Sequence, residues 1–275
     1  MRLGTVIITY NPSIDRLKKS VKSIKDQSEK IIIVDNGSSN IGEICNLISN
    51  EEKIEIIRND RNYGIAKALN IGMQYMLLNH FDWALTLDQD SICPGDFIVH
   101  AKKLAKYKSI GIICPAVAYR GWPSRTPQHK KKVSQIKACM TSGSLTRVAA
   151  WSEVKGYDES FFIDYVDNDF CEKLKIRGYK IVRINDDLMS HELGEPGKRM
   201  VLGHNVRYAH HAAWRYYYMI RNNLVFIRRY RKRLNVPKEY LKVLYIILMA
   251  LSIEHNKVEV FKNIIHGARN SIKMA

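Results

Sequence analysis

Residues 85–91 read LTLDQDS, an apolar run that ends in two carboxylates, Asp88 and Asp90, one residue apart. The segment DWALTL at 82–87 is typical of a buried β-strand, so both acids follow a strand end. Neighbouring carboxylates repel each other unless a cation is present, and Mg²⁺ or Mn²⁺ is bound by such oxygens together with phosphates. The stretch therefore indicates a metal site, with a solvated turn or a helix N-cap before Pro94 as the alternative.

Strand-like and helix-like segments alternate through the first part of the chain. We expect strands at 3–9, 30–34, 53–58, 82–87 and 110–117, and helices at 13–26 and 65–78. This alternation predicts an α/β fold, a Rossmann-like three-layer α/β/α sandwich with a mostly parallel central sheet. Residues 119–137 are rich in Pro, Gly and positive charge and predict a long loop. The region from 205 onward is expected to be helical, with helices at 214–233, 238–252 and 258–272.

Polar residues follow three of the predicted strands. Thr9 and Asn11 come after the first strand, Asp35 after the second, and Asp88 with Asp90 after the fourth. In sheets of this class, ligands lie beyond the carboxyl ends of the strands. We therefore expect these three clusters to meet at one edge of the sheet, which is more informative than any cluster alone.

Positive charge is concentrated in the last third of the chain. The formal net charge is +17, and residues 198–275 carry 16 Lys or Arg against 3 Asp or Glu. Such asymmetry predicts an anionic partner: nucleic acid, a membrane surface or a phosphorylated substrate. The hydrophobic content of 46% and charged content of 26% are ordinary for a globular protein.

Cysteine usage and apolar runs indicate a cytoplasmic protein. The five cysteines include no C-x-x-C pair, which argues against a disulfide framework or a zinc site. The N-terminal apolar run is too short for a signal peptide. The longest apolar run, 243–253, is about half of the ~20 residues needed to cross a bilayer.

Seven motifs occur in a characteristic order. They are TYN (9–11), VDNGS (34–38), NYGIAKALN (62–70), LDQDS (87–91), TSGSL (141–145), FFIDYVDNDFCEKLKIRGY (161–179) and MSHELG (189–194). Together they resemble the inverting family 2 glycosyltransferases with a GT-A fold, over about residues 3–225. DQDS, FIDYVD and HELG most resemble the bacterial rhamnosyltransferases that use dTDP-L-rhamnose.

The resemblance implies roles for individual residues and a divalent metal, Mg²⁺ or Mn²⁺, as cofactor. Asp167 matches the catalytic base, although Val166 precedes it where the family has Glu, which leaves Asp164 and Asp169 as alternatives. Asp90 and His191 match metal ligands. The positions that match contacts to the donor nucleotide are Thr9, Asn11, Asp35, Lys67 and Asp88.

Each position also has a purely structural interpretation. Asp35 fits a tight turn, Lys67 a solvated helix face and His191 a polar loop. Asp169 fits the first turn of a helix, where the dipole favours acids. Gly143 allows either a close approach of a ligand to the backbone or a bend.

The sequence suggests a catalytic domain at 1–204 and a basic, aromatic-rich helical region at 205–275. Arg221 lies in a Y-x-x-R-N block similar to one in the rhamnosyl branch, which implies a phosphate of donor or acceptor as its partner. The helix at 238–252 is apolar nearly all round and flanked by basic helices, which fits peripheral attachment to an anionic membrane surface. A core helix or an oligomer contact fits equally well.

The expected function is transfer of a sugar to a glycan acceptor linked to polyprenyl diphosphate. The expected sugar is foremost L-rhamnose, donated by dTDP-L-rhamnose. The expected pathway is the synthesis of surface polysaccharide such as O-antigen or capsule. The family implies that acceptor and a location at the inner face of the cell membrane. Donors such as UDP-galactofuranose, UDP-glucose or UDP-N-acetylglucosamine are the main alternative. A nucleic-acid-binding protein is disfavoured because no RNA-binding signature or zinc finger occurs and the carboxylate clusters would repel phosphates. A catalytically inactive sugar-nucleotide binder is disfavoured by the presence of Asp90, Asp167 and His191.

Overall fold

The computed structural model describes residues 1–49, 51–119, 131–191, 196–201 and 204–274. The chain forms two compact units. The first contains Met1–Phe162 and Val166–Glu192, and the second contains Ile163–Tyr165 and Leu193–Ala275. The functional division predicted at residues 204 and 205 stays a prediction.

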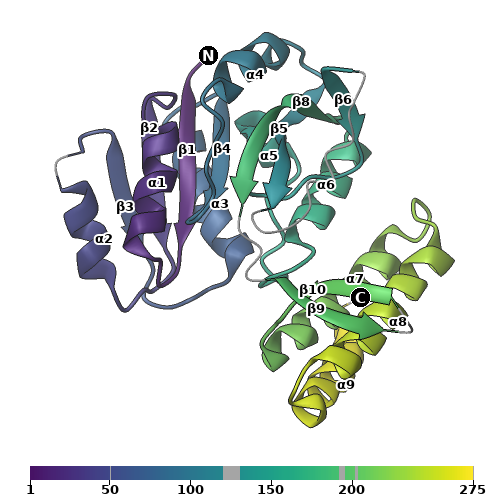
Figure 1. Ribbon diagram of the computed structural model, residues 1–275. Helices are drawn as coiled ribbons and strands as arrows, with labels where there is room; N and C mark the ends of the chain where they lie inside the picture. The colour runs from purple at the N-terminus through teal and green to yellow at the C-terminus, as the bar shows by residue number, and fades with distance from the viewer. Residues whose placement is uncertain (50, 120–130, 192–195, 202–203, 275) are drawn as a thin grey trace. The chain divides into compact units, whose positions relative to one another are not determined.

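An eight-stranded sheet forms the centre of the first unit, in the order β3-β2-β1-β4-β7-β5-β8-β6 (Figure 1). Pairing is parallel between β1 and both its neighbours, between β2 and β3, and between β5 and β8. It is antiparallel on both sides of β7 and between β6 and β8. The predicted α/β fold with a mostly parallel sheet is confirmed. The strands are β1 (Leu3–Thr9), β2 (Lys30–Asp35), β3 (Ile54–Arg58), β4 (Trp83–Asp88), β5 (Ile110–Tyr119), β6 (Val133–Ile136), β7 (Ser144–Arg147) and β8 (Lys180–His191).

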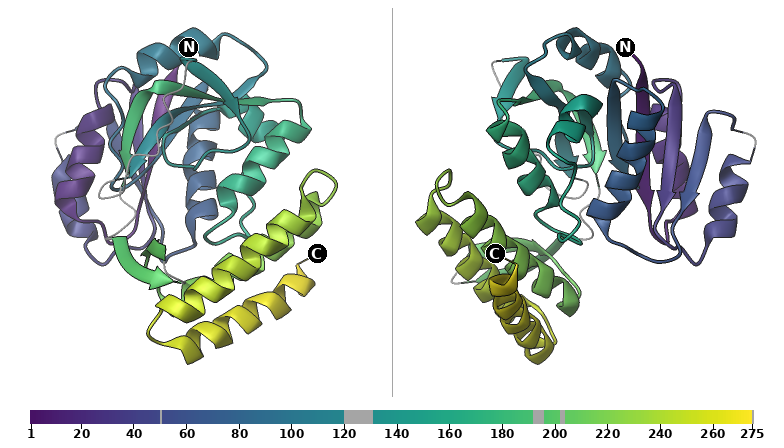
Figure 2. Two further views of the ribbon diagram at one scale, coloured as in Figure 1. Left: turned by 45° about the vertical axis from the view of Figure 1, so that its right-hand side comes forward. Right: turned by 180° about the vertical axis from the view of Figure 1, so that it is seen from behind.

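Helices cover both faces of this sheet (Figures 1 and 2). On one face, apolar residues of α1 (Ile14–Ile24), α2 (Ile41–Ile48) and α4 (Phe97–Ala105) share a core with alternate residues of the strands. On the other face, α3 (Ile65–Leu78) lies against β1. The contact is close, because a Cβ at Gly72 would lie 2.2 Å from a Val6 methyl carbon. The helices α5 (Val148–Glu153) and α6 (Val166–Ile176) complete the unit.

Two secondary-structure predictions are wrong. The loop predicted at 119–137 contains strand β6, which pairs with β8 at the edge of the sheet. Its sequence, VSQI, is short and half polar, so it carries no apolar alternation, and backbone pairing with β8 decides its conformation. Residues 120–130 of that loop lie outside the described residues. The region predicted to be helical from 205 instead begins with strand β10 (His204–Ala209), which pairs with β9 (Pro196–Val201).

The second unit combines this hairpin with three helices, α7 (Ala213–Tyr230), α8 (Val236–Ile253) and α9 (Lys257–Lys273), which confirm the predicted helices within a few residues. Their apolar residues form a separate core that includes Ile220, Val243 and Ile264. Gly267 permits close packing of α9 on α7, because a Cβ there would lie 2.4 Å from the carbonyl oxygen of Tyr217. Among the described residues, every helix is too short or too polar to cross a bilayer.

Candidate functional site

The carboxyl ends of β1, β2 and β4 lie side by side, as the sequence predicts. Thr9 at the end of β1 is in register with Asp35 at the end of β2. On the other side of β1, Ile8 is in register with Asp88. The three polar clusters that follow these strands therefore meet at one edge of the sheet.

Asp35 organises the turn after β2. Its side chain is fully buried and accepts hydrogen bonds from the hydroxyl of Thr9 at 3.0 Å and from the backbone N–H of Ser38 at 2.9 Å. The Ser38 hydroxyl also donates to this carboxylate and accepts from the backbone N–H of Asn11. Asn11 in turn accepts from the N–H of Ser39 at 2.8 Å. Thr9, Asn11 and Asp35 thus fix the shape of two neighbouring loops, and their contact with a nucleotide stays a prediction.

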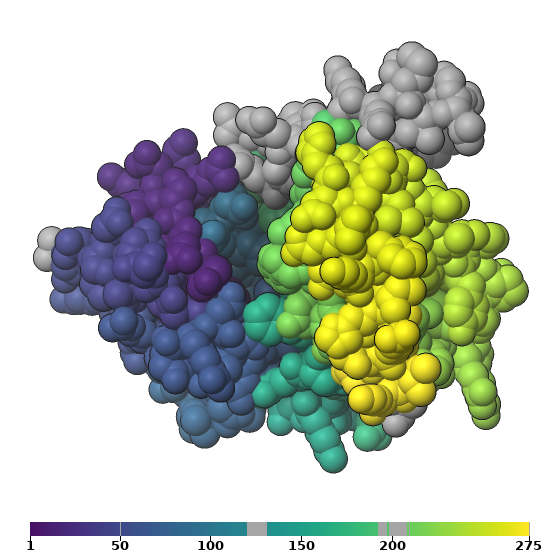
Figure 3. Space-filling view, turned by 90° about the horizontal axis from the view of Figure 1, so that it is seen from below, coloured from purple at the N-terminus to yellow at the C-terminus, as the bar shows by residue number. Residues whose placement is uncertain are grey.

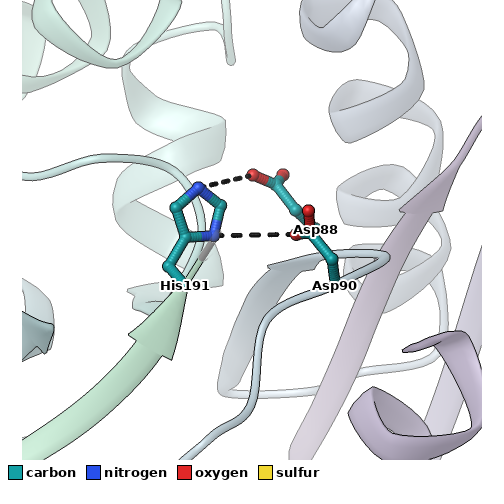
Figure 4. Close-up of side chains that lie close together, drawn as sticks. All are labelled: Asp88, Asp90 and His191. Carbon is teal, nitrogen blue, oxygen red and sulfur yellow. Dashed lines mark ion pairs between the residues drawn. The ribbon is translucent and has the colours of Figure 1, made fainter. Parts of the chain in front are cut away.

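Asp88, Asp90 and His191 form a cluster at the same edge of the sheet (Figure 4). One ligand atom from each lies within 4.8 Å of the others. His191 Nε2 lies 4.0 Å from an oxygen of Asp88, and Nδ1 lies 3.7 Å from an oxygen of Asp90. The structure therefore brings together the two residues that the sequence assigns to the metal, and adds Asp88 to them.

Two buried serines hold this cluster in place. The Ser142 hydroxyl accepts from the backbone N–H of Asp88 at 2.9 Å and donates to the hydroxyl of Ser91 at 2.7 Å. Ser91 lies 2.7 Å from His191 Nδ1. A short antiparallel bridge between Ile92 and Ser190 also ties the loop after β4 to the end of β8. The backbone of Asp88 and the imidazole of His191 are therefore positioned by hydrogen bonds.

The donor set of this cluster fits a divalent cation. Two carboxylates and one imidazole offer oxygen and nitrogen ligands, which suit Mg²⁺ or Mn²⁺ when substrate phosphates and water complete the shell. The carboxylates also repel each other. Although 36% of the Asp88 side chain is accessible, burial is the main cause that raises its pKa to about 6; His191 opposes this increase, and the charge of Asp90 adds a smaller one. The positive charge of a bound cation would favour the ionised form of Asp88 and so lower this pKa.

Binding of Mn²⁺ to the purified protein is expected to strengthen as the pH rises through about 6. Asp88 must lose its proton to serve as a ligand, so the apparent dissociation constant should fall about tenfold from roughly pH 5 to pH 7. Without metal, the stability of the folded protein falls as the pH rises from about 4 to about 6, because the pKa of Asp88 in the folded state exceeds the usual aspartate value of 3.8. Calorimetric titration with Mn²⁺ at several pH values measures the effect. A dissociation constant that does not change with pH would contradict it.

The acids near α6 fall into different environments. Asp164, with a positive φ of 64°, forms an ion pair with Arg215 at 2.9 Å. Asp169 is fully buried in the first turn of α6, in agreement with its predicted structural role. Asp167, in the same turn, is partly exposed, and its carboxylate accepts from the N–H of Asn168 at 2.8 Å. The role of Asp167 as the catalytic base stays a prediction.

Tyr119 is a site residue that the sequence analysis missed. It ends β5 in register with His191, and the two rings meet edge to face with centroids 6.1 Å apart. Burial first, and then the negative charge of Asp167, raise the pKa of Tyr119. Its hydroxyl therefore stays protonated near neutral pH. Tyr119 stands at the end of a strand, as Thr9 and Asp88 do. The rule that ligands lie beyond the carboxyl ends of strands, applied to β5, would have identified Tyr119. Ser91 and Ser142 lie in the motifs LDQDS and TSGSL, but their role could not be predicted because it depends on contacts distant in sequence.

Three other predicted positions have structural partners of their own. Lys67 forms an ion pair with Glu159 at 2.9 Å, and this hydrogen bond raises its pKa. Gly143 has a φ of +81°, and a Cβ there would lie 2.6 Å from the sulfur of Met189, so packing alone requires glycine. In the second unit, Arg221 lies over the rings of Tyr217 and Tyr218 and donates to Asn222. The ligand contacts predicted for these residues stay predictions.

Comparison with known proteins agrees with this geometry. The family model described as glycosyl transferase family 2 matches residues 5–182, well over half of the chain. The chain belongs to glycosyl transferase family 2. This glycosyltransferase is 28% identical to the dTDP-rhamnosyl transferase RfbF of Shigella flexneri, over 98% of its own length and 94% of that protein's.

Solved structures share the fold of this glycosyltransferase. Residues 1–349 of S. aureus TarS, in complex with UDP-GlcNAc, match 99% of the chain and 81% of the solved one, with a TM-score of 0.63 and 15% identity. The mannosyltransferase PcManGT from Pyrobaculum calidifontis, in complex with GDP-Man and Mn²⁺, matches 100% of the chain and 74% of its own, with a TM-score of 0.62 and 12% identity. At these identities the likeness concerns the fold, and it confirms the predicted GT-A type.

Proposed function

We propose that this glycosyltransferase transfers L-rhamnose from dTDP-L-rhamnose to a glycan acceptor, with inversion at the anomeric carbon. The observation that carries the proposal is the cluster of Asp88, Asp90 and His191 at the carboxyl edge of the sheet. The likeness to RfbF over nearly the whole chain supports the donor. The acid in the first turn of α6 supports a single displacement, because one attack assisted by one base inverts the reacting carbon.

Different residues of the chain have different proposed roles in this reaction. Asp90 and His191, with Asp88 beside them, would hold Mg²⁺ or Mn²⁺, and the cation would offset negative charge on the leaving diphosphate. Asp167 would take the proton from the acceptor hydroxyl as that oxygen attacks the sugar. The turn organised by Asp35 would orient the nucleoside. Lys67 remains a proposed contact to the donor nucleotide, and Gly143 and Arg221 remain proposed contacts to a phosphate or the acceptor.

The proposed acceptor is a glycan linked to polyprenyl diphosphate in the synthesis of cell-surface polysaccharide. The positive charge of residues 198–275, with 16 cations against 3 acids, suits an anionic lipid-linked substrate. Such an acceptor places the enzyme at the cytoplasmic face of the cell membrane. We propose that it associates there peripherally.

A screen of nucleotide sugars is expected to show turnover of dTDP-L-rhamnose only when a divalent ion is present. Purified protein is incubated with dTDP-, UDP- and GDP-sugars and a membrane extract as the source of acceptor, and release of nucleoside diphosphate is measured. EDTA should abolish release, and added Mg²⁺ or Mn²⁺ should restore it. Preferred turnover of a UDP-sugar would overturn the proposed donor but not the reaction class, and release that EDTA leaves unchanged would overturn the proposed metal.

A further inference from the structure

Helix α8 exposes a row of large apolar side chains although its other side contributes to a core. Val243, Ala250 and Ile253 are buried in the second unit. The exposed row, called the α8 stripe, consists of Tyr240, Leu241, Leu244, Tyr245 and Leu248. Leu241 is 64% exposed and Leu248 is 57% exposed. These positions recur at spacings of three and four residues, so they share one side of the helix.

Helix α9 repeats this arrangement. Val260 and Ile264 are buried in the same core, whereas the α9 stripe, made of Val258, Phe261, Ile265 and Ile272, is exposed. Phe261 is 52% exposed and Ile272 is 70% exposed. In the view of Figure 3, α9 forms part of the visible surface (yellow). Two consecutive helices thus present apolar side chains to solvent, and clustered exposure of this kind indicates an interaction surface.

Cations accompany both stripes. Lys238 lies on α8, and Lys257, Lys262, Arg269 and Lys273 lie on α9. In the part of the chain that the structure describes, none of these five forms an ion pair. Three acids offset half of the six Lys and Arg of residues 236–273, which leaves a net charge of +3. Glu239 forms an ion pair with Lys242, Glu254 is buried beside His210 and Tyr216, and Glu259 caps the start of α9 with Asn256.

The charge pattern distinguishes between two occupants of this surface. A second copy of the chain would bring rows of like charge together, which opposes association. An anionic bilayer instead attracts each cation, accepts the apolar side chains at the boundary between headgroups and acyl chains, and suits Tyr240 and Tyr245 at the interface. The described helices are too short or too polar to span a bilayer, so such a contact would be with its surface.

We propose that the α8 and α9 stripes, with the cations beside them, form the surface by which this protein binds an anionic phospholipid bilayer. The proposal rests on the peripheral membrane association given above as part of the function, and it assigns that association to named residues. Aliphatic and aromatic side chains enter the interfacial region, while lysine and arginine stay at the level of the lipid phosphates. The bound sugar nucleotide takes no part in this contact.

Vesicle binding of the full chain tests the proposal in the absence of donor and metal. The protein is sedimented with vesicles of phosphatidylcholine alone or mixed with phosphatidylglycerol. Binding is expected only to the mixed vesicles and should weaken as salt increases. Leu244→Glu with Leu248→Glu should lower the bound fraction about tenfold, and Lys262→Glu with Arg269→Glu should have a similar effect.

Matched variants in the first unit serve as controls. Leu78→Glu changes an exposed leucine of α3, and Lys102→Glu with Lys103→Glu reverses two exposed cations of α4, so binding should stay unchanged. Circular dichroism establishes that each variant is folded, and the charge variants test the surface even if the leucine pair misfolds.

Absence of binding to both vesicle types would overturn the proposal. So would a dimer in light scattering that Leu244→Glu with Leu248→Glu converts to a monomer. Lipid binding without turnover of dTDP-L-rhamnose would overturn only the proposed donor.

Discussion

Asp167→Asn is expected to lower kcat for sugar transfer by about 10²–10⁴-fold. The substitution keeps the size of the side chain and its place in the first turn of α6, but the amide cannot accept the proton of the attacking hydroxyl. Because a general base acts mainly in the transition state, the Michaelis constant for the donor should change little. Release of dTDP from dTDP-L-rhamnose, with a membrane extract as the source of acceptor, measures both parameters.

The neighbouring acids provide the comparison for this variant. Asp186→Asn replaces an exposed acid on β8 and should leave kcat unchanged. Asp164→Asn removes the ion pair with Arg215 and should act mainly on stability, which thermal unfolding measures. If Asp167→Asn retained the wild-type kcat while Asp164→Asn or Asp169→Asn lost it, the base would be assigned to a different acid.

Asp90→Asn is expected to reduce both Mn²⁺ affinity and sugar transfer, the latter by about 10²–10³-fold. The amide keeps the shape of the side chain in the cluster with Asp88 and His191 but removes one negative charge. A cation would therefore be held more weakly beside the leaving diphosphate. Calorimetry with Mn²⁺ and the same release assay test the two effects separately.

Two further variants define how specific this loss is. Asp96→Asn changes an exposed acid at the start of α4 and should bind Mn²⁺ as the wild type does. Ser91→Ala removes the hydroxyl that contacts His191 and should lower metal affinity by about 10–100-fold, as is typical for residues that orient ligands. Asp90→Asn with unchanged affinity and unchanged turnover would show that the cluster holds no catalytic metal.

Most of the central fold could be predicted from local patterns. The predicted strands at 3–9 and 30–34 are strands β1 and β2, because continuous apolar runs are typical of strands buried on both faces. Strands β6 and β10 could not be predicted in this way. Each is short and rich in polar residues, and each is held by antiparallel pairing with a neighbouring strand. Their conformation depends on backbone partners rather than on a period in their own sequence.

The candidate site likewise combines contacts that the sequence predicted with contacts that only the structure revealed. The rule that ligands lie at strand ends brought Thr9, Asp35 and Asp88 together, and the register of the strands confirms their proximity. The partners of Lys67 and Gly143 were not predictable, because Glu159 and Met189 are distant from them in sequence.

The sequence by itself determined the alternating strands and helices, the acids that follow the strands and the positive charge of the last third of the chain. These features depend on residue type and short-range spacing, which the chain specifies locally. Only the tertiary structure decided that His191 meets Asp88 and Asp90, that Ser142 and Ser91 hydrogen-bond to the Asp88 backbone and to His191, and that apolar side chains of α8 and α9 remain exposed. The physical reason is that the order of strands in a sheet and the packing of helices set these contacts, and residues far apart in sequence supply them.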